Sequence, residues 1–331
     1  MSTLALVGDV GGTKTLLRLV DEQGVALRTA RFDSRGAELA AIITRFLDGV
    51  RPRVAVLGVA GPVLDGVCAT TNLPWLLDER ALERQLGISR VRLLNDFEAT
   101  AYGVLHVDPS QLISLQGGER RPHGQVAVIG AGTGLGEAFL VWTGDDYVVV
   151  PTEGGHGDFA PRNDREDLVL RTLRARLGRV SVERVVSGLG IVEVYEALRD
   201  GGVAPESEAV AAQLRAGDPG AVIGEHALRG GDPLCEATID LFVSAYGAEA
   251  GNFALRTLAR GGVFVTGGIA PKLLPKLREG AFVQAFRDKG RLSDVVDAIP
   301  VSVVLDPEVP LVGALHVARA IAARVTSAGT G

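Results

Sequence analysis

The sequence predicts an α/β protein that folds into two domains. Apolar, strand-like runs alternate with segments of helical spacing, a pattern typical of α/β domains with a largely parallel sheet. The chain has 331 residues, which is enough for a large core and for more than one domain. A strand, a glycine turn and a second strand occur near residue 4 and again near residue 126, which suggests that the two domains are related.

The first domain is expected to begin as a β-meander and to continue with alternating helices and strands. Short apolar runs indicate strands, and apolar residues at helical spacing indicate helices. The expected strands are residues 4–8, 16–20, 24–32, 54–63 and 91–94, and the expected helices are 37–49 and 78–87.

Residues 126–141 (VAVIGAGTGLGEAFLV) repeat the pattern of residues 4–20 (LALVGDVGGTKTLLRLV). Each segment has an apolar strand, a glycine-rich turn that contains Thr and another apolar strand, so each domain is expected to open with a hairpin. Helical patterns dominate residues 165–260, because glycines there follow long segments of helical spacing. The remaining expected elements are a helix ending on Gly178, a long helix from 233 to Gly261-Gly262, strands at 262–271 and 301–305, and a last helix at about 310–325.

The composition is that of a globular protein without a basic surface. Hydrophobic residues make up 47% of the chain and the net charge is −6, so we expect neither nucleic acid nor an anionic membrane as a partner. No signal peptide is recognisable, and no apolar stretch reaches the length of about 18 residues that a membrane span needs. Cys68 and Cys235 lack metal-like spacing, and we expect them to be reduced core residues of a cytoplasmic protein.

Residues 8–15 (GDVGGTKT) nearly match a phosphate-binding P-loop, but Thr13 stands where its second Gly is required. A tight hairpin explains Gly11 and Gly12. It does not explain Asp9 and Thr13, which flank the turn. Asp9 at a strand end could hold Mg²⁺ through water, while the backbone N–H groups of the turn meet phosphate.

Two further strands end in glycine-rich turns. Residues 130–136 (GAGTGLG) fail the dinucleotide fingerprint, but their alternating glycines let the backbone approach an anion, with the Thr133 hydroxyl as a donor. We therefore favour phosphate contact at Gly132, Thr133 and Gly134. Residues 263–270 (VFVTGGIA) are either a turn before a helix that Pro271 starts or a backbone floor for adenosine, and the segment alone does not decide.

Residues 153–161 (EGGHGDFAP) place Glu153 and His156 on a glycine loop, followed by Asp158. A metal site would need a recognisable ligand set, which is absent from the sequence. The pair suits a polyol, because Glu accepts from hydroxyls and His can both donate and accept. Glu183 is expected in the first turn of a helix, where interaction with the helix dipole is an adequate explanation by itself.

Residues 92–104 (RLLNDFEATAYGV) end a buried strand with Asn95 and Asp96 and begin a helix at once. Both residue types cap helices, so a structural role is one explanation. The other is chemistry, because ligands gather at the carboxyl ends of strands in α/β sheets, and a carboxylate there can accept a proton.

These motifs, in this order, resemble those of the bacterial glucokinase family, which phosphorylates free glucose with ATP. The resemblance spans the chain from Leu4 to the last helix and rests on GDVGGT, TNLPW, LLNDFEATAYG, GAGTGLG, EGGHGDFAP, ERVVSGLG and GGVFVTGGI. It implies a two-domain actin-like ATPase (ribonuclease H-like) fold, with a smaller α/β domain, a larger α+β domain and an active-site cleft between them. We expect the smaller domain at residues 1–110 plus 305–331 and the larger at 111–304.

The resemblance also implies roles for single residues. Asp96 matches the catalytic base, Asn95 and Glu183 match sugar-binding residues, and Glu153 and His156 match ligands of the sugar hydroxyls. The turns at 8–13 and 130–136 match the two phosphate segments, and Gly267-Gly268 matches the adenosine segment. The implied substrates are glucose and Mg-ATP, with no permanent metal ligand, and the implied assembly is a homodimer.

Two departures from the family pattern stand out. Lys14-Thr15 makes the first turn more like that of the related repressor/open-reading-frame/kinase (ROK) group, but that group usually carries a Cys-rich zinc motif, and no cysteine lies between Cys68 and Cys235. Gly157 replaces a larger apolar residue, which would loosen the sugar loop and widen specificity.

The sequence fits three alternative functions to different degrees. A kinase for another hexose or an N-acetylhexosamine stays open. A non-catalytic ATP-binding regulator is disfavoured by the intact acidic residues, and a nicotinamide dehydrogenase by the failed fingerprint.

Overall fold

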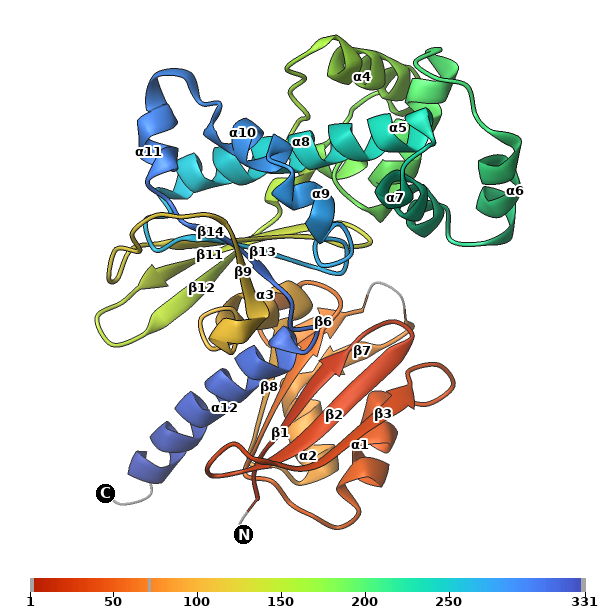
Figure 1. The fold of residues 1–331 in the computed structure, drawn as a ribbon. Coiled ribbons are helices and arrows are strands. Elements are labelled where there is room, and N and C mark those ends of the chain that lie inside the picture. Colours follow the sequence, from red (N-terminus) through yellow and green to blue (C-terminus); the bar gives the residue numbers. More distant parts are fainter. Residues whose placement is uncertain (1–2, 71–72, 329–331) are drawn as a thin grey trace. The chain divides into compact units, whose positions relative to one another are not determined.

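The computed structural model describes residues 3–70 and 73–328, so two residues of the TNLPW segment, 71 and 72, lie outside the described residues. The chain forms two compact units. Unit 1 comprises Met1–Asp108 and Asp306–Gly331, and unit 2 comprises Pro109–Leu305. Each unit has its own main sheet, helices and core (Figure 1).

Unit 1 is built on a five-stranded sheet in the order β3-β2-β1-β4-β8. Its strands are β1 (Thr3–Val10), β2 (Lys14–Asp21), β3 (Ala26–Asp33), β4 (Val54–Val59) and β8 (Arg90–Asn95). The expected meander is confirmed, because β1, β2 and β3 pair antiparallel, while β1, β4 and β8 pair parallel. The expectation of a largely parallel sheet was wrong for this unit, since short turns can join only antiparallel neighbours.

Both faces of this sheet are covered by helices. One face packs on α1 (Leu39–Leu47) and α2 (Glu79–Leu86), around Leu6 and Leu57. The other face packs on α12 (Val309–Ala328) and on α3 (Asp96–Gly103), around Val7 and Val56. A small second sheet consists of β5 (Val63–Leu64), β6 (Val67–Ala69) and β7 (Leu76–Asp78).

Unit 2 repeats the topology of unit 1 and adds one edge strand. Its sheet has the order β12-β11-β10-β13-β14-β9, with a meander of three strands followed by two parallel strands. The internal repeat expected from residues 4 and 126 is therefore confirmed. The strands are β9 (Leu112–Gln116), β10 (Val126–Ala131), β11 (Leu135–Trp142), β12 (Tyr147–Thr152), β13 (Val263–Thr266) and β14 (Val301–Val304).

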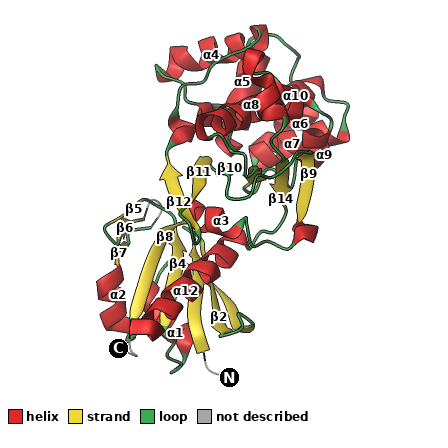
Figure 2. Ribbon diagram, turned by 90° about the vertical axis from the view of Figure 1, so that its left-hand side faces the viewer, coloured by secondary structure: helices red, strands yellow, loops and turns green. Residues whose placement is uncertain are grey.

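The helices of unit 2 lie together on one side of its sheet (Figure 2). The 25-residue α8 lies in the middle of the unit, and its Phe242 and Tyr246 are fully buried. Its bounds correct the sequence expectation, because the helix ends at Thr257 rather than at Gly261-Gly262, with Leu258 in a left-handed conformation (φ 45°). The helices are α4 (Asp164–Leu177), α5 (Gly188–Asp200), α6 (Glu208–Ala216), α7 (Pro219–Arg229), α8 (Pro233–Thr257), α9 (Leu274–Arg278), α10 (Ala281–Arg287) and α11 (Ser293–Asp297).

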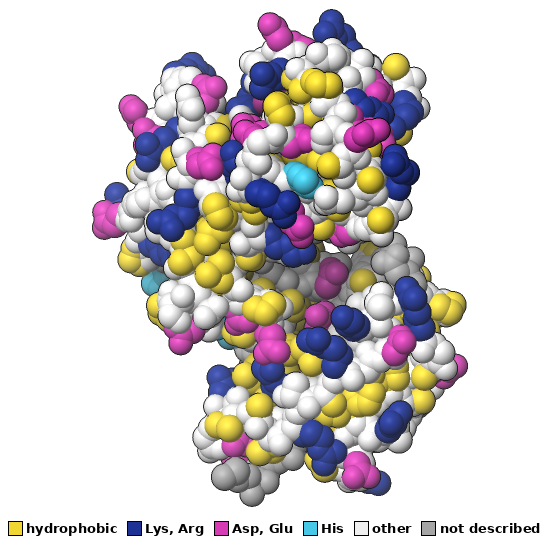
Figure 3. Space-filling model, turned by 45° about the vertical axis from the view of Figure 1, so that its right-hand side comes forward, with side chains coloured by type: hydrophobic (Ala, Val, Ile, Leu, Met, Phe, Trp, Pro, Cys, Tyr) yellow, Lys and Arg dark blue, Asp and Glu magenta, His cyan; other side chains and the backbone are white. Residues whose placement is uncertain are grey.

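The composition predicted a surface that is not basic, no membrane span and reduced, buried cysteines. Acidic and basic side chains are interspersed over the face shown in Figure 3. Within the part of the chain that the structure describes, no helix has the length and apolar character of a membrane span. Cys68 and Cys235 are buried and unbridged, as expected.

Candidate functional site

The first glycine turn joins β1 to β2 in unit 1. Gly11 N–H donates to the Lys14 carbonyl at 3.0 Å, which closes the turn. Ser34, the residue after β3, fixes the turn, because its N–H donates to the Thr13 carbonyl and its Oγ to the Gly11 carbonyl at 2.8 Å. Among the described residues, no acceptor takes the N–H groups of Gly12 and Thr13. The turn therefore offers two backbone donors to an anion.

Asp9 precedes this turn at the end of β1. It lies in register with Gly58 of β4, which has no side chain to crowd it. Burial, and secondarily the negative charge of Asp96, raises the pKa of the Asp9 carboxyl to about 6. A half-buried carboxylate beside a second carboxylate is a hard oxygen donor set whose repulsion a cation would relieve. Asp9 thus fits the expected role near Mg²⁺.

Asn95 and Asp96 lie where β8 ends and α3 begins, and Asp96 Oδ1 accepts from the Phe97 N–H at 2.8 Å. Asn95 is the N-cap of α3: its Oδ1 accepts from the N–H of Phe97 (2.9 Å) and of Glu98 (3.3 Å), and the Glu98 carboxylate accepts from the Asn95 N–H. Its Nδ2 donates to the Gly61 carbonyl at 3.0 Å. Asp96 is the first residue of the helix itself and is exposed. The cap is therefore Asn95, and the Asp96 carboxylate stands at the positive end of α3.

Close backbone packing holds α3 in place. Ala99 of α3 lies over Gly58 of β4, and a methyl group on Gly58 would come within 3.2 Å of its Cβ. On the opposite side, methyl groups on Gly103 or Gly313 would collide with backbone carbonyls of α12 and α3, respectively. Glycine at these contacts allows the helices to approach closely, which fixes where the first turn of α3 presents Asp96.

The second glycine turn joins β10 to β11 in unit 2. Gly132 N–H donates to the Gly134 carbonyl, and Gly188 N–H, at the start of α5, donates to the Gly132 carbonyl, both at 2.8 Å. Thr133 at the tip is exposed. Among the described residues, no acceptor takes the N–H groups of Thr133 and Gly134. This turn has the same anion-binding character as the turn in unit 1.

The Gly267-Gly268 turn lies beside the second glycine turn. Ile269 N–H donates to the Ala131 carbonyl at 3.3 Å, which ties the end of β13 to the end of β10. Gly267 has φ +87°, and a methyl group there would collide with the Ala131 carbonyl, so only glycine fits. Gly268 is exposed and has no atom within 4 Å of the place that a Cβ would take. The expectation that Pro271 starts the next helix was wrong, because α9 begins at Leu274.

The carboxylates of Glu153 and Glu183, two expected sugar-binding residues, lie near the imidazole of a third, His156. His156 Nε2 lies 3.8 Å from Glu153 Oε2, and His156 Nδ1 lies 3.9 Å from Glu183 Oε1. Both distances exceed a hydrogen bond, so the carboxylates remain able to accept from another group. Glu183 is fixed by its other oxygen, which accepts from the Leu135 N–H of β11 at 2.9 Å. Its expected helical turn is a single 3₁₀ turn, Val182–Arg184.

The sugar loop is tied to the segment that carries Glu183. Phe159 N–H donates to the Val180 carbonyl, and Val182 N–H donates to the Gly157 carbonyl at 2.9 Å. Gly157 N–H also donates to the Gly154 carbonyl at 2.8 Å. Gly157 is therefore hydrogen-bonded through both of its backbone groups, and the loosening expected from this glycine is not seen in the backbone.

Arg179 contacts the middle of this loop at two residues, His156 and Asp158. Its Nε lies 2.6 Å from Asp158 Oδ1, and its Nη2 donates to the His156 carbonyl at 2.6 Å. Asp158 is thus paired with a cation rather than placed as a metal ligand. Within residues 3–70 and 73–328, no three His, Cys, Asp or Glu side chains gather in a way that could hold a metal ion.

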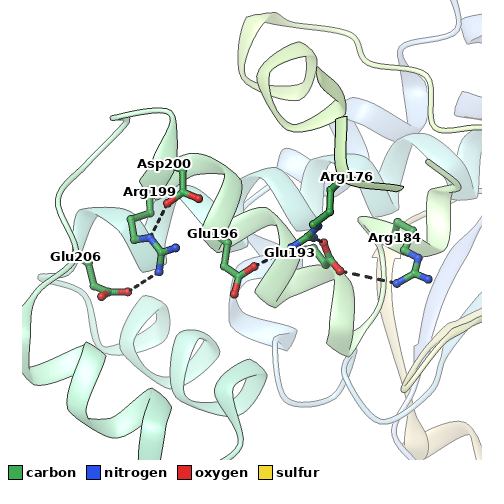
Figure 4. Close-up of polar contacts among 7 residues, drawn as sticks. All are labelled: Arg176, Arg184, Glu193, Glu196, Arg199, Asp200 and Glu206. Atoms are coloured by element: carbon green, nitrogen blue, oxygen red, sulfur yellow. Dashed lines mark hydrogen bonds and ion pairs between the residues drawn. The ribbon is translucent and has the colours of Figure 1, made fainter. Parts of the chain in front are cut away.

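A network of ion pairs anchors the Glu183 segment to α5 (Figure 4). Arg184, next to Glu183, lies 3.8 Å from Glu193 of α5. Arg176, near the end of α4, contacts Glu193 and lies 3.3 Å from Glu196. Farther along α5, Arg199 pairs with Asp200 and Glu206. The Arg184 pair ties the Glu183 segment to α5, the Arg176 pairs tie α4 to α5, and each of these partly exposed pairs contributes little.

The structure reveals three positioning residues that no sequence motif marks. Ser34 holds the first turn, Arg179 holds the sugar loop, and Tyr246 joins the ends of β10 and β13. The buried Tyr246 hydroxyl accepts from the Ala131 N–H at 3.1 Å and lies 3.4 Å from the Thr266 carbonyl. Each acts across at least 19 residues of sequence, and no local motif marks such a contact.

The chain matches the Glucokinase family model over residues 6–321. It belongs to the glucokinase family. The glucokinase of Nostoc punctiforme is 44% identical over 94% of this chain and 98% of that protein. The glucokinase of Synechocystis is 40% identical over 93% of this chain and 96% of that protein. The resemblance inferred from the motifs is therefore confirmed.

Solved structures show the same fold. A glucokinase from an Antarctic psychrotroph superposes with a TM-score of 0.83 at 32% identity, covering 94% of this chain and 98% of that one. A ROK family glucokinase from Streptomyces griseus, in complex with glucose and AMPPNP, gives a TM-score of 0.64 at 22% identity, covering 96% and 99%. The fold is the two-domain actin-like ATPase fold, and the match to the psychrotroph glucokinase is the better of these two.

Proposed function

We propose that this protein is an ATP-dependent glucokinase, which transfers the γ-phosphoryl group of ATP to the 6-hydroxyl of D-glucose and releases glucose 6-phosphate and ADP. The curated relatives of up to 44% identity that carry the name glucokinase support this proposal. The observation that carries it is the group of Glu153, His156 and Glu183, with the carboxylates 3.8 and 3.9 Å from the imidazole. That arrangement suits adjacent hydroxyls of a sugar ring.

The sugar residues would have separate tasks. Glu153 is the most exposed of the three and would accept hydrogen bonds from ring hydroxyls. Glu183 is fixed by the Leu135 N–H and would accept from a neighbouring hydroxyl with its other oxygen. His156 would donate to one hydroxyl and accept from another. Asn95 Nδ2 uses one N–H for the Gly61 carbonyl, and its second N–H would donate to a sugar hydroxyl while Oδ1 caps α3.

Asp96 would act as the general base. The proton of the 6-hydroxyl would pass to the Asp96 carboxylate as the bond between that oxygen and the γ-phosphorus forms and the bond to the ADP oxygen breaks. An exposed carboxylate is suited to this, because it can reach a substrate without leaving its place in α3. The N-cap bonds of Asn95 keep the helix start fixed while Asp96 accepts the proton.

The two glycine turns would bind the triphosphate. Gly12, Thr13, Thr133 and Gly134 carry backbone N–H groups that no acceptor within the described residues takes, and such groups neutralise phosphate oxygens. Mg²⁺, which would arrive as Mg-ATP, neutralises charge on the β- and γ-phosphates. Asp9 would hold it through water. The exposed Gly267-Gly268 turn would lie against the adenosine.

The wider biology is proposed on the family resemblance alone. We propose that the protein works as a cytoplasmic homodimer and that its domains are residues 1–110 plus 305–331 and residues 111–304.

The first experiment measures ADP formation from Mg-ATP by the purified protein with and without glucose. Glucose-dependent turnover, with glucose 6-phosphate identified as the product, would support the proposal. ADP release that ignores glucose, or faster turnover with mannose, fructose or N-acetylmannosamine, would replace glucose as the acceptor. A folded protein that binds ATP without any turnover would favour a regulator instead.

A further inference from the structure

A buried carboxyl group lies directly beneath the proposed sugar loop. Glu137 is on β11, is 2% exposed and lies in register with Thr152, the last residue of β12. The Thr152 hydroxyl donates to the Glu137 carbonyl at 2.9 Å and accepts from the Gly154 N–H. Gly154 opens the turn that carries His156, and a methyl group on it would collide with the Glu137 carboxyl. The loop therefore rests on this side chain.

The Glu137 carboxyl has an unusual set of neighbours. Within the described residues, neither of its oxygens receives a hydrogen bond. Its closest charged neighbours come from α8: the buried Glu249, and Arg256, whose Nη2 is 3.8 Å from Glu137 Oε2. Arg256 contacts the Glu249 carboxylate directly, and Asn252 Nδ2 donates to it at 3.1 Å. One cation therefore faces two buried carboxyls and is already engaged by one of them.

Two other titratable groups face the pair, because Tyr246 lies in the field of Glu137 and Lys289 lies in the field of Glu249. Tyr246 of α8 is neutral and engaged with β10. Lys289, which follows α10, donates to the Ala285 carbonyl, and Arg162 is paired with Glu166. Burial, and secondarily the charge of Glu249, raises the pKa of Glu137 to about 8. A protonated Glu137 could donate to Glu249, which removes the repulsion between the two acids.

We propose that Glu137, in its protonated form, is a positioning residue of the sugar site: it forms the floor under Gly154 and so holds Glu153 and His156 in place. The proposal rests on the proposed function, because it assigns those two residues to glucose. Ionised Glu137 would be a buried charge next to Glu249 with only one shared cation. Displacing the loop would admit water to that charge, so ionisation would weaken sugar binding.

The test is the KM for glucose at pH 7 and pH 9. With a pKa of about 8, the ionised fraction of Glu137 rises from about one tenth to about nine tenths over this range. If only the protonated form holds the loop, the KM of the wild type rises about tenfold. Glu137→Gln keeps the size and the neutral state of the protonated acid, so its KM should match the wild type at pH 7 and change less than about twofold by pH 9.

Two further variants serve as a control and as a test of the side chain itself. Glu225→Gln makes the same chemical change on an exposed carboxyl of α7 and should retain the tenfold rise of the wild type. Glu137→Ala removes the floor and should raise the KM at both pH values. The proposal is overturned if Glu137→Gln keeps the full rise with pH, or if Glu137→Ala binds glucose like the wild type at pH 7.

A second readout does not depend on turnover. Hydrogen exchange of the peptide covering residues 152–160, corrected for the intrinsic rate at each pH, should show loss of protection from pH 7 to pH 9 in the wild type but not in Glu137→Gln. If the protein does not phosphorylate glucose and this pattern still appears, the proposed function fails while the role of Glu137 in the loop stands. Equal protection in both proteins at both pH values would overturn that role.

Discussion

Substitutions at Asn95 and Asp96 should separate stability from chemistry, although the two residues are adjacent. Asn95 makes three hydrogen bonds through its side chain, two as the N-cap of α3 and one to the Gly61 carbonyl. Loss of the cap costs about 1 kcal/mol, and loss of a further part-buried hydrogen bond costs about 1 kcal/mol. Asn95→Ala should therefore lower the free energy of unfolding by about 2 kcal/mol.

Asp96→Ala should lower the free energy of unfolding only slightly but lower kcat strongly. Asp96 is exposed, and its stabilising effect combines that of an acidic residue in the first turn of a helix with the hydrogen bond that its Oδ1 accepts from the Phe97 N–H at 2.8 Å, together about 1 kcal/mol. As the proposed general base, however, it should contribute at least about 10²-fold to kcat. Asp96→Asn should lose the same rate, because an amide cannot accept the proton, while it keeps the shape of the side chain.

The assay combines urea denaturation with steady-state kinetics for the wild type and for each variant of Asn95 and Asp96. Asn95→Asp is the matched control, because Asp is an equally good N-cap but cannot donate to the Gly61 carbonyl, so about half of the stability loss should return. Near-wild-type kcat in folded Asp96→Ala would refute the assignment of the base. A larger stability loss in Asp96→Ala than in Asn95→Ala would refute the assignment of the cap.

Three further predictions follow from the same contacts. Gly267→Ala should destabilise the protein by about 1–3 kcal/mol in denaturation, because φ is +87° and the Ala131 carbonyl is in the way, whereas Gly268→Ala should leave stability unchanged and serve as its control. Arg179→Ala should raise the KM for glucose about tenfold with little change in kcat, and Arg179→Lys should restore part of it. Because the pKa of Asp9 is raised to about 6, kcat/KM for Mg-ATP should fall about tenfold per pH unit below pH 6, and an acid limb that persists in Asp9→Asn would contradict this.

The sequence could predict features that depend on neighbouring residues. The meander at residues 4–32 and its repeat at 126 are marked by apolar runs and glycine turns, and both were found. The share of parallel pairing was misjudged, because the pattern of a strand does not reveal the direction of its neighbour. The end of α8 was misplaced by four residues, because Leu258 ends the helix in a left-handed conformation that the sequence does not mark.

The sequence could predict which residues belong to the candidate site, but not which contacts hold them in place. The order of motifs identified Glu153, His156 and Glu183, because each lies in a recognisable segment. It could not show that Arg179 clamps the loop or that Glu137 lies beneath it, because these contacts join segments far apart in the chain. The buried pairing of Glu137 with Glu249 depends on α8 packing against β11, which only the tertiary structure determines.

The repeated topology explains why the proposed base lies in only one unit. In unit 2, β14 holds the place that β8 holds in unit 1, and it ends at Val304, before Leu305-Asp306, whereas Asn95 itself ends β8 and Asp96 begins α3. Asp306 Oδ1 accepts from the Glu308 N–H at 2.8 Å, just before α12, so this acid helps to start a helix. In unit 1 the Asn95 side chain caps α3, while the exposed carboxylate of Asp96 accepts from the Phe97 N–H at 2.8 Å through Oδ1. The proposed base is therefore an exposed carboxylate beside a separate cap, an arrangement that Leu305-Asp306 does not repeat.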